Sequence, residues 1–368
     1  MSSLAGVVER SSVVVCCGSG GVGKTTISAV VGIEAARRGR RVVVVTIDPA
    51  RRLADALGLP EGLASLPQRV PLDLGPDAAP GGELWAMMLD TAAMFERVVR
   101  ANAADEQQAE RIVQNRFYRN MAGALSGTQE YMASEALHEL HGDERFDLVV
   151  VDTPPSRNAL DFLEASGVLT RFLDHKLFKL LMVPTRSGLK VIGTASQPIL
   201  RAIGRVVGSD VLADAVGFFQ AFGGMERGFR DRAQAVTELL HEETTAFVLV
   251  TSPHRETVVE ATWFADQLIE QGFTVAATVV NRAHPRFGGG TAADAEQAAT
   301  ASEATGAADA AALWRNLAEL RAIAESEHEQ LGPLIERVDA DTLVEVPLLP
   351  TDVHDVEALE MLGRHLFG

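Results

Sequence analysis

Short apolar runs and longer amphipathic stretches alternate along most of the chain. Residues 13–17 form a continuous apolar run that ends in glycines, and residues 25–38 then show helical spacing that Gly39 closes. The further apolar runs are at residues 41–47, 146–151, 246–251, 273–280 and 342–346, with a helical pattern over 254–271. This alternation predicts an α/β fold with a doubly wound, mostly parallel sheet and right-handed crossovers.

Two regions break this alternation with patterns that are mostly helical. They span residues 84–140 and 167–243, and we expect them to form a helical subdomain inserted into a single domain that covers residues 1–368. Residues 288–312 are rich in Gly and Ala with scattered acidic residues. This composition favours a mobile loop ahead of a helix that contains Trp314.

The charge and hydropathy of the chain narrow the classes of partner. The 368 residues carry a formal net charge of −17, so the overall field repels phosphate backbones and anionic lipid headgroups. No uncharged apolar stretch approaches the ~18 residues expected of a membrane span, and the N-terminus lacks the pattern of a secretion signal. We therefore expect a cytoplasmic protein with no integral membrane segment and no nucleic-acid partner.

The residues that follow the first apolar run match a phosphate-binding loop. Residues 18–26 read GSGGVGKTT and fit G-x-x-x-x-G-K-[ST], with a predicted strand before them and a predicted helix after them. In such a loop backbone N–H groups converge on phosphate oxygens, Lys24 reaches the β- and γ-phosphates, and the Thr25 hydroxyl binds Mg²⁺. The expected nucleotide contacts are Gly20, Gly21, Val22, Gly23, Lys24, Thr25 and Thr26. The motif predicts a P-loop ATPase that uses ATP and Mg²⁺.

Two aspartates, Asp48 and Asp152, directly follow predicted strands. Open parallel sheets bind their ligands at the carboxyl ends of the strands. Phosphoryl transfer needs a carboxylate near Mg²⁺ and a group that orients the attacking water, and the two aspartates could supply both. Either residue could instead simply cap the helix that follows it.

Four segments together resemble the ArsA-like ATPases, which include the arsenite-pump ATPase and the ATPases that target tail-anchored proteins. The segments are GSGGVGKTT, TIDPARRLADALGL, FDLVVVDTPPSRNALDFLEA and VVNR, the last at residues 279–282. Their order and spacing also match, over residues 10–60, 128–165 and 246–362. The helical middle of the chain matches only in size and apolar character. The resemblance implies a P-loop NTPase fold with a deviant Walker A loop.

The resemblance also implies a role for individual residues. Asp48 would orient the hydrolytic water, and Asp152 would be the switch aspartate near Mg²⁺, acting through a water molecule. Asn281 would read the adenine edge and Pro347 would lie near the base. An Asn after a strand can also serve simply as a turn residue.

The chain departs from the family pattern in three places. Ser19 stands where these ATPases usually carry a second lysine that reaches the nucleotide of a partner subunit. Arg157 stands where the family's switch segment has a glycine, and no C-x-x-C occurs, so the zinc that joins some family dimers is not expected. We expect Arg51, Arg52 or Arg157 to replace the lysine charge in cis, or a related lysine-bearing subunit to supply it in trans.

Three weaker signals favour ordinary structure. Cys16 and Cys17 are adjacent in a predicted strand, where their side chains should point to opposite faces as small buried hydrophobes. His138 and His141 have metal-ligand spacing, yet an exposed helical face produces the same pattern. The C-terminal segment 357–368 could be an amphipathic membrane helix, but its few basic residues favour a helix that covers the sheet.

The resemblance predicts a nucleotide-switched ATPase dimer that binds a hydrophobic client or drives an anion-transport partner. Apolar stretches at 176–183 and 211–225 could line a client groove or form an ordinary helical core. One alternative is a positioning ATPase of the ParA and MinD kind, against which the long helical insertions and acidic charge argue. A second alternative, suggested by Ser19, is a weakly hydrolysing nucleotide-binding subunit of a hetero-oligomer.

Overall fold

The structure is a computed structural model that describes residues 3–48, 50–116, 128–154, 161–165, 167, 209–351, 353 and 355–368. Its contacts divide the chain into two compact units. The sheet unit consists of Met1–Met88, Asp143–Ala159 and His241–Gly368, and the helical unit consists of Leu89–Gly142 and Leu160–Leu240. The helical unit therefore uses most of the two segments that the sequence pattern marks as helical.

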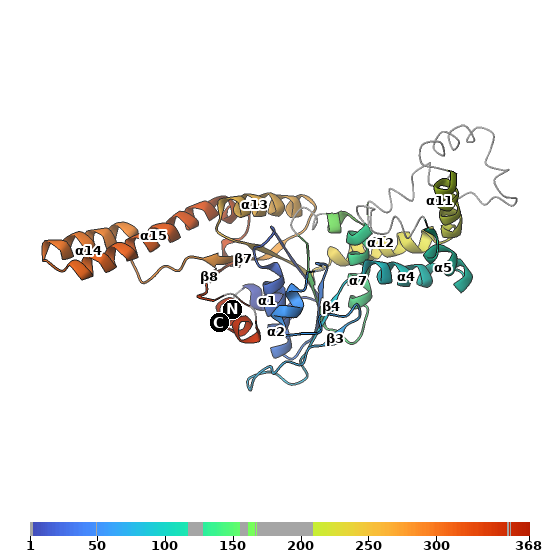
Figure 1. The fold of residues 1–368 in the computed structure, drawn as a ribbon, viewed down its shortest axis with the longest axis horizontal. Helices are drawn as coiled ribbons and strands as arrows, with labels where there is room; N and C mark the ends of the chain where they lie inside the picture. Colours follow the sequence, from blue (N-terminus) through green and yellow to red (C-terminus); the bar gives the residue numbers. More distant parts are fainter. Residues whose placement is uncertain are drawn as a thin grey trace. The chain divides into compact units, whose positions relative to one another are not determined.

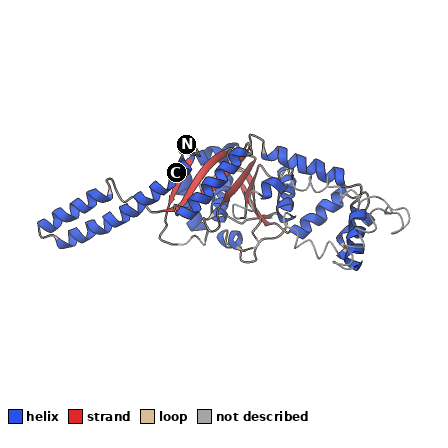
Figure 2. Cartoon of the chain, turned by 90° about the horizontal axis from the view of Figure 1, so that it is seen from above, coloured by secondary structure: helices blue, strands red, loops and turns tan. Residues whose placement is uncertain are grey.

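The sheet unit is built on an eight-stranded sheet with the order β3-β4-β2-β5-β1-β6-β7-β8. Figure 2 shows strands in red with helices in blue around them. The strands are β1 (Val13–Gly18), β2 (Arg41–Thr46), β3 (Gln68–Arg69), β4 (Glu83–Met88), β5 (Leu148–Asp152), β6 (Thr245–Thr251), β7 (Val275–Ala283) and β8 (Leu343–Pro347). All neighbouring strands pair in parallel except β3 and β4, which are antiparallel. The predicted α/β, mostly parallel fold is confirmed.

The strand order places β1 at the centre of the sheet, between β5 and β6. The chain leaves β1 toward β2 through α2 (Lys24–Arg37) and later leaves β6 in the other direction through α13 (Arg255–Glu270). Right-handed crossovers in opposite directions put these two helices on opposite faces of the sheet (Figure 1). Ligands of such sheets bind at this reversal point, which is where the loop 18–26 lies.

Helices α1 (Ser3–Arg10) and α16 (Val356–Phe367) pack with α2, and α3 (Arg52–Ala56) follows β2. Helix α16 buries Leu359, Leu362 and Leu366 and also contacts β8. The C-terminal helix thus covers part of the sheet, as the sequence favours. The helices within the described residues include none that is both long enough and apolar enough to cross a membrane.

Strand β4 corrects the predicted boundary of the helical region. Residues 84–88, expected to begin the helical subdomain, instead pair with β2, where Leu84 lies opposite Val42 and Met88 opposite Thr46. The segment ELWAMM consists of residues compatible with either a helix or a strand, so the free edge of β2 decides its conformation. At the other end, residues 241–243 belong to the sheet unit.

Helix α14 (Ala292–Ala304) corrects a second expectation, the mobile loop at residues 288–312. Thr291 accepts a hydrogen bond from the Asp294 backbone, and Asp294 accepts one from the Thr291 backbone, which forms a capping box. The alanine-rich sequence that follows has high helix propensity. Helix α14 forms a hairpin with α15 (Ala308–Ile335), and a 3₁₀ turn η2 (Ala340–Thr342) leads into β8 (Figure 1).

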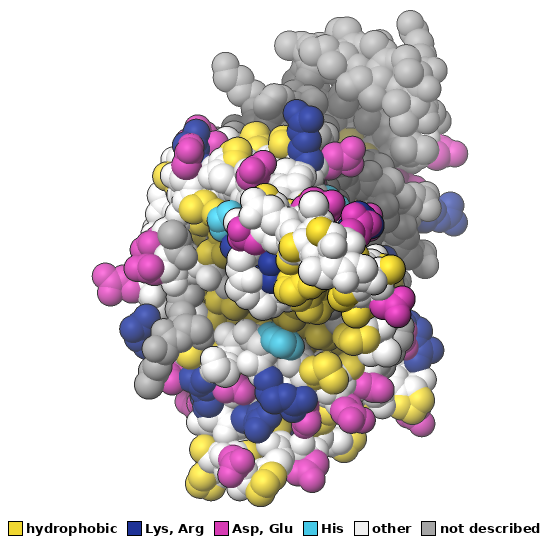
Figure 3. Space-filling view, turned by 90° about the vertical axis from the view of Figure 1, so that its left-hand side faces the viewer, with side chains coloured by type: hydrophobic (Ala, Val, Ile, Leu, Met, Phe, Trp, Pro, Cys, Tyr) yellow, Lys and Arg dark blue, Asp and Glu magenta, His cyan; other side chains and the backbone are white. Residues whose placement is uncertain are grey.

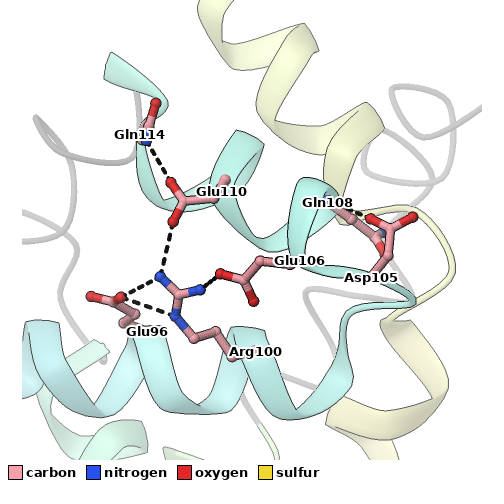
Figure 4. Close-up of polar contacts among 7 residues, drawn as sticks. All are labelled: Glu96, Arg100, Asp105, Glu106, Gln108, Glu110 and Gln114. Atoms are coloured by element: carbon pink, nitrogen blue, oxygen red, sulfur yellow. Dashed lines mark hydrogen bonds and ion pairs between the residues drawn. The ribbon is translucent and has the colours of Figure 1, made fainter.

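The helical unit contains α4 (Thr91–Asn102), α5 (Glu106–Val113), α7 (Thr128–His141), α11 (Ser209–Phe222) and α12 (Glu226–Leu240). Arg100 on α4 pairs with Glu96, Glu106 and Glu110, which ties α4 to α5 (Figure 4). Glu135 on α7 is fully buried and pairs with Arg232 of α12 at 2.5 Å. Because the first cluster is exposed, whereas loss of Arg232 would leave the buried Glu135 carboxylate without this partner, the Glu135–Arg232 pair is the stronger constraint on this unit.

Candidate nucleotide site

The loop between β1 and α2 requires glycine at two positions. A Cβ on Gly18 would lie 2.0 Å from the carbonyl oxygen of Val250, and one on Gly23 would lie 2.4 Å from the Asn281 side-chain nitrogen. Gly23 also has φ 99°, a left-handed conformation that favours glycine. It is the N-cap of α2, and no side chain caps this helix end. The first N–H groups of α2 are therefore open to an anion.

Lys24 lies folded over this loop. Its Nζ donates a hydrogen bond to the carbonyl oxygen of Ser19 at 2.8 Å, and the residue is only 8% exposed. Burial lowers the pKa of Lys24, while the nearby Asp152 carboxylate acts in the opposite direction. The ammonium group thus lies at the mouth of the loop, where phosphate oxygens would replace the carbonyl as its partner.

Asp152 lies at the end of β5, where two threonine hydroxyls meet it. Thr25 Oγ1 and Thr46 Oγ1 each donate a hydrogen bond to Asp152 Oδ2 at 2.8 Å. The residue is 1% exposed, and its Oδ1 has no hydrogen-bond partner among the described residues. Burial raises the pKa of Asp152 to about 6, although the two threonine hydrogen bonds lower it.

These oxygen atoms suit a hard divalent cation. Mg²⁺ prefers oxygen ligands and keeps several waters, so a threonine hydroxyl beside a carboxylate with one unpartnered oxygen fits it. The structure brings Thr25 and Asp152 into direct contact across 127 positions of sequence. Both predicted metal residues therefore lie together, on the side of the loop where phosphates would enter.

A cavity of about 510 Å³ opens in front of the loop. The loop residues that line it are Gly20, Gly21, Gly23, Lys24, Thr25 and Thr26. Asp48 lines the same cavity from the end of β2, and its Oδ1 accepts a hydrogen bond from the Ala50 backbone at 2.9 Å. The Val22 side chain instead belongs to the buried core, so only its backbone can contact a ligand.

A second cavity of about 210 Å³ brings together the two residues expected near the base, Asn281 and Pro347. Thr26, Arg282 and Val353 line both cavities, so the two spaces adjoin. Asn281 Nδ2 already donates a hydrogen bond to the carbonyl oxygen of Val22 at 2.8 Å. Asn281 thus supports the loop directly, and its contact with adenine stays a prediction.

Arg282 is the main residue that the sequence analysis misses. It has φ 63°, an uncommon conformation for a residue with a side chain. Its Nη1 lies 3.4 Å from the carbonyl oxygen of Gly21, so the guanidinium reaches over the loop. The sequence feature that could have identified Arg282 as a site residue is its position directly after Asn281 at the end of a predicted strand.

Two of the three arginines expected to offset phosphate charge lie in the described residues, and of these two Arg52 lines the cavity. It lines the cavity with Nη1 3.5 Å from Asp48 Oδ2. Arg51 instead donates to the carbonyl oxygen of Pro60 at 2.5 Å. Arg157 lies outside the described residues. Ser19 is 2% exposed and its hydroxyl has no partner among the described residues, so its side chain points inward.

The weaker candidates occupy ordinary positions. Cys16 and Cys17 are buried in β1, and burial raises the pKa of the Cys16 thiol to about 12. His138 lies on α7, where burial and Arg232 lower its pKa. Among the described residues, no group of three or more His, Cys, Asp or Glu side chains is arranged to hold a metal.

Comparison with known proteins gives one consistent family. A family model described as anion-transporting ATPase matches residues 11–288, which include the loop, both aspartates and Asn281. An arsenical pump-driving ATPase of Acidiphilium multivorum is 26% identical over 356 residues, covering 94% of this chain and 46% of the relative.

Two further relatives match shorter parts of the chain. An ATPase GET3 of Malassezia globosa is 27% identical over 173 residues, covering 46% of this chain and 48% of the relative. Protein Rv2184c of Mycobacterium tuberculosis is 31% identical over 174 residues, covering 46% of this chain and 41% of the relative. The chain thus spans about half the length of these curated relatives.

Proposed function

This chain belongs to the anion-transporting ATPase family, and we propose that it binds ATP with Mg²⁺ and hydrolyses it to ADP and phosphate. The observation that carries the proposal is that Lys24 and Thr25 line one cavity while the Thr25 hydroxyl donates to the carboxylate of Asp152, which comes from a strand far away in sequence. This set contains a cation for phosphates and oxygen ligands for Mg²⁺.

Each residue has a separate task in this proposal. The N–H groups of the loop and Lys24 would hold the β- and γ-phosphates, and Thr25 and Asp152 would hold Mg²⁺, Asp152 through a water molecule. Bound Mg²⁺ would neutralise charge on the phosphates. Asp48 orients a water whose oxygen bonds to the γ-phosphorus while the bond to the bridging oxygen breaks. The adenine occupies the adjoining cavity beside Asn281 and Pro347.

Two substitutions separate binding from turnover. Lys24→Ala removes the cation from the loop, so we expect ATP affinity to fall by at least ~10-fold. Asp48→Asn keeps the size of the side chain but removes its charge, so we expect binding within ~2-fold of the wild type and turnover at least ~100-fold slower. Isothermal titration and phosphate release measure the two quantities. Wild-type turnover by the Asp48→Asn variant would show that the catalytic assignment is wrong.

We further propose that the chain works as a dimer in the cytoplasm, either with a second copy or with a related subunit. Family members named arsenical pump-driving ATPase and GET3 support a nucleotide-driven role in transport or targeting. A hydrophobic client or an anion-transport partner would then respond to the nucleotide state. Of the proposed client stretches, residues 176–183 lie outside the described part of the chain. Residues 211–225 fall largely in α11, where Phe218 and Phe222 pack together.

Binding and turnover measurements distinguish the two alternative functions from the proposed one. A positioning ATPase of the ParA and MinD kind would pellet with DNA or liposomes in a salt-sensitive way, whereas the charge of −17 predicts no such binding. A weakly hydrolysing subunit would bind ATP normally but show negligible steady-state turnover until a lysine-bearing relative is added.

A further inference from the structure

Helix α15 exposes large apolar side chains along one face. Leu313, Leu320 and Ile323 are 70%, 38% and 42% exposed, and Leu317 between them is half-buried. Positions 313, 317 and 320 follow the i, i+4, i+7 spacing of one helical face, and Ile323 extends it by another turn. We call these four residues the leucine stripe.

The leucine stripe faces away from the other helix of the hairpin. Within residues 309–320 of α15 the buried residues are Ala311 and Ala318, and Arg315 reaches Glu303 of α14 at 2.6 Å. Small side chains therefore pack between the two helices while the large apolar ones stay outside. This arrangement is the reverse of an ordinary amphipathic helix, whose large apolar side chains face the partner helix.

The charges around the leucine stripe are acidic. Asp309 and Glu319 are exposed, lie one turn before Leu313 and Ile323, and have no ion-pair partner among the described residues. The two arginines of α15 are engaged elsewhere. Arg315 pairs with α14, and Arg321 donates hydrogen bonds to carbonyl oxygens in the turn before α14.

Hydrogen bonds attach α15 to the segment between β7 and α14, and so hold the hairpin that carries the leucine stripe. His284, just after β7, contacts Glu327 of α15 through its backbone N–H at 2.8 Å and its ring Nδ1 at 2.7 Å. Arg321 donates to the carbonyl oxygens of Phe287 and Gly289 at 2.9 and 2.6 Å. The view along the hairpin shows hydrophobic side chains at its surface, with acidic side chains among them (Figure 3).

We propose that the leucine stripe is a docking site for an amphipathic α-helix of a partner protein whose apolar face is flanked by Lys or Arg. An apolar helix face covers the stripe, and the basic flanks pair with Asp309 and Glu319. A second copy of this chain would instead bring acidic margins against acidic margins. An anionic lipid surface would be repelled by the same charges.

Two synthetic helical peptides test this proposal on the intact protein. Both have about 20 residues and the same leucine spacing, and the flanking residues are lysine in one and glutamate in the other. Fluorescence anisotropy with labelled peptides measures binding. We expect the lysine peptide to bind at least ~10-fold more tightly than the glutamate peptide.

Matched variants locate the binding. Leu313→Glu with Leu320→Glu should weaken binding of the lysine peptide by at least ~10-fold. Leu66→Glu with Ile269→Glu adds the same charge at two other exposed apolar residues of the sheet unit and should change it by less than ~2-fold. Circular dichroism and ATP binding confirm that both variants are folded.

A charge exchange gives the decisive outcome. Asp309→Lys with Glu319→Lys should reverse the preference, so that the glutamate peptide binds better. The proposal is overturned if both double-Glu variants bind the lysine peptide alike, or if the exchange leaves the preference unchanged. It is also overturned if Leu313→Glu with Leu320→Glu dissociates a dimer of the purified chain, because a second copy would then be the occupant.

Discussion

At the scale of single residues, Arg282 combines an unfavourable backbone with a position at the nucleotide site. Its φ of 63° places it in the left-handed region, which costs a residue with a Cβ ~1 kcal/mol. The guanidinium lies over the Gly21 carbonyl and lines both cavities. Such strain persists where surrounding contacts impose it, and it is concentrated at functional sites.

Replacing Arg282 should therefore separate stability from binding. We expect Arg282→Gly to raise the free energy of unfolding by ~1 kcal/mol, because glycine adopts positive φ freely. The same change should weaken ATP binding by ~5-fold or more, because a cation near the phosphates is lost. Denaturant unfolding and calorimetric titration measure the two effects. Arg282→Lys is the control, since it keeps the charge, and it should retain more of the affinity than Arg282→Gly. Unchanged affinity in Arg282→Gly would remove Arg282 from the site.

At the scale of elements, helix α14 depends on its first turn. The capping box joins Thr291 and Asp294, with Thr291 Oγ1 accepting from the Asp294 backbone at 3.1 Å and Asp294 Oδ2 accepting from the Thr291 backbone at 2.7 Å. Few buried side chains hold this helix, since only Ala295 and Ala299 are buried. Local capping is therefore a large part of what keeps the segment helical.

Thr291→Ala should weaken α14 selectively. Loss of the cap should cost ~1 kcal/mol and speed hydrogen exchange of amides in the first turns of α14. Thr300→Ala is the matched control, because its hydroxyl bonds only the Glu296 carbonyl within the helix and alanine has higher helix propensity. Hydrogen exchange read by mass spectrometry compares the two. Equal protection in both variants would mean that packing against α15, and not the cap, holds the helix.

At the scale of the whole molecule, the charge of −17 bears on assembly. Two copies of an acidic chain repel each other, and salt screens that repulsion over a Debye length of about 8 Å at physiological ionic strength. If the dimer is a homodimer, its association should therefore strengthen as salt rises from low to physiological concentration. A complex with a subunit of opposite local charge should weaken over the same range. Analytical ultracentrifugation with ATP and Mg²⁺, using the Asp48→Asn variant to prevent turnover, distinguishes the two.

The sequence by itself determined the parts that depend on neighbouring residues. The sequence predicts the loop 18–26, the central strands and the aspartates at the strand ends. It can do so because hydrophobic period, glycine spacing and helix start signals each lie within a short run of neighbouring residues. The residue types in GSGGVGKTT already specify a phosphate loop, and the structure adds that Gly18 and Gly23 also make room for Val250 and Asn281. The cap of α14 is equally local, at Thr291 and Asp294, but the Gly- and Ala-rich composition of residues 288–312 favoured a loop.

Only the tertiary structure decided the rest. The conformation of residues 83–88 follows from the open edge of β2, because the segment alone is compatible with a helix or a strand. The contact between Asn281 and the Val22 carbonyl joins residues 259 positions apart. Arg282 likewise contacts the Gly21 carbonyl across a long sequence separation. Arg51 donates to the Pro60 carbonyl and does not line the nucleotide cavity. These contacts depend on which strands pair and on which hydrogen-bond acceptor lies nearest in space, and neither is encoded in any local run of residues.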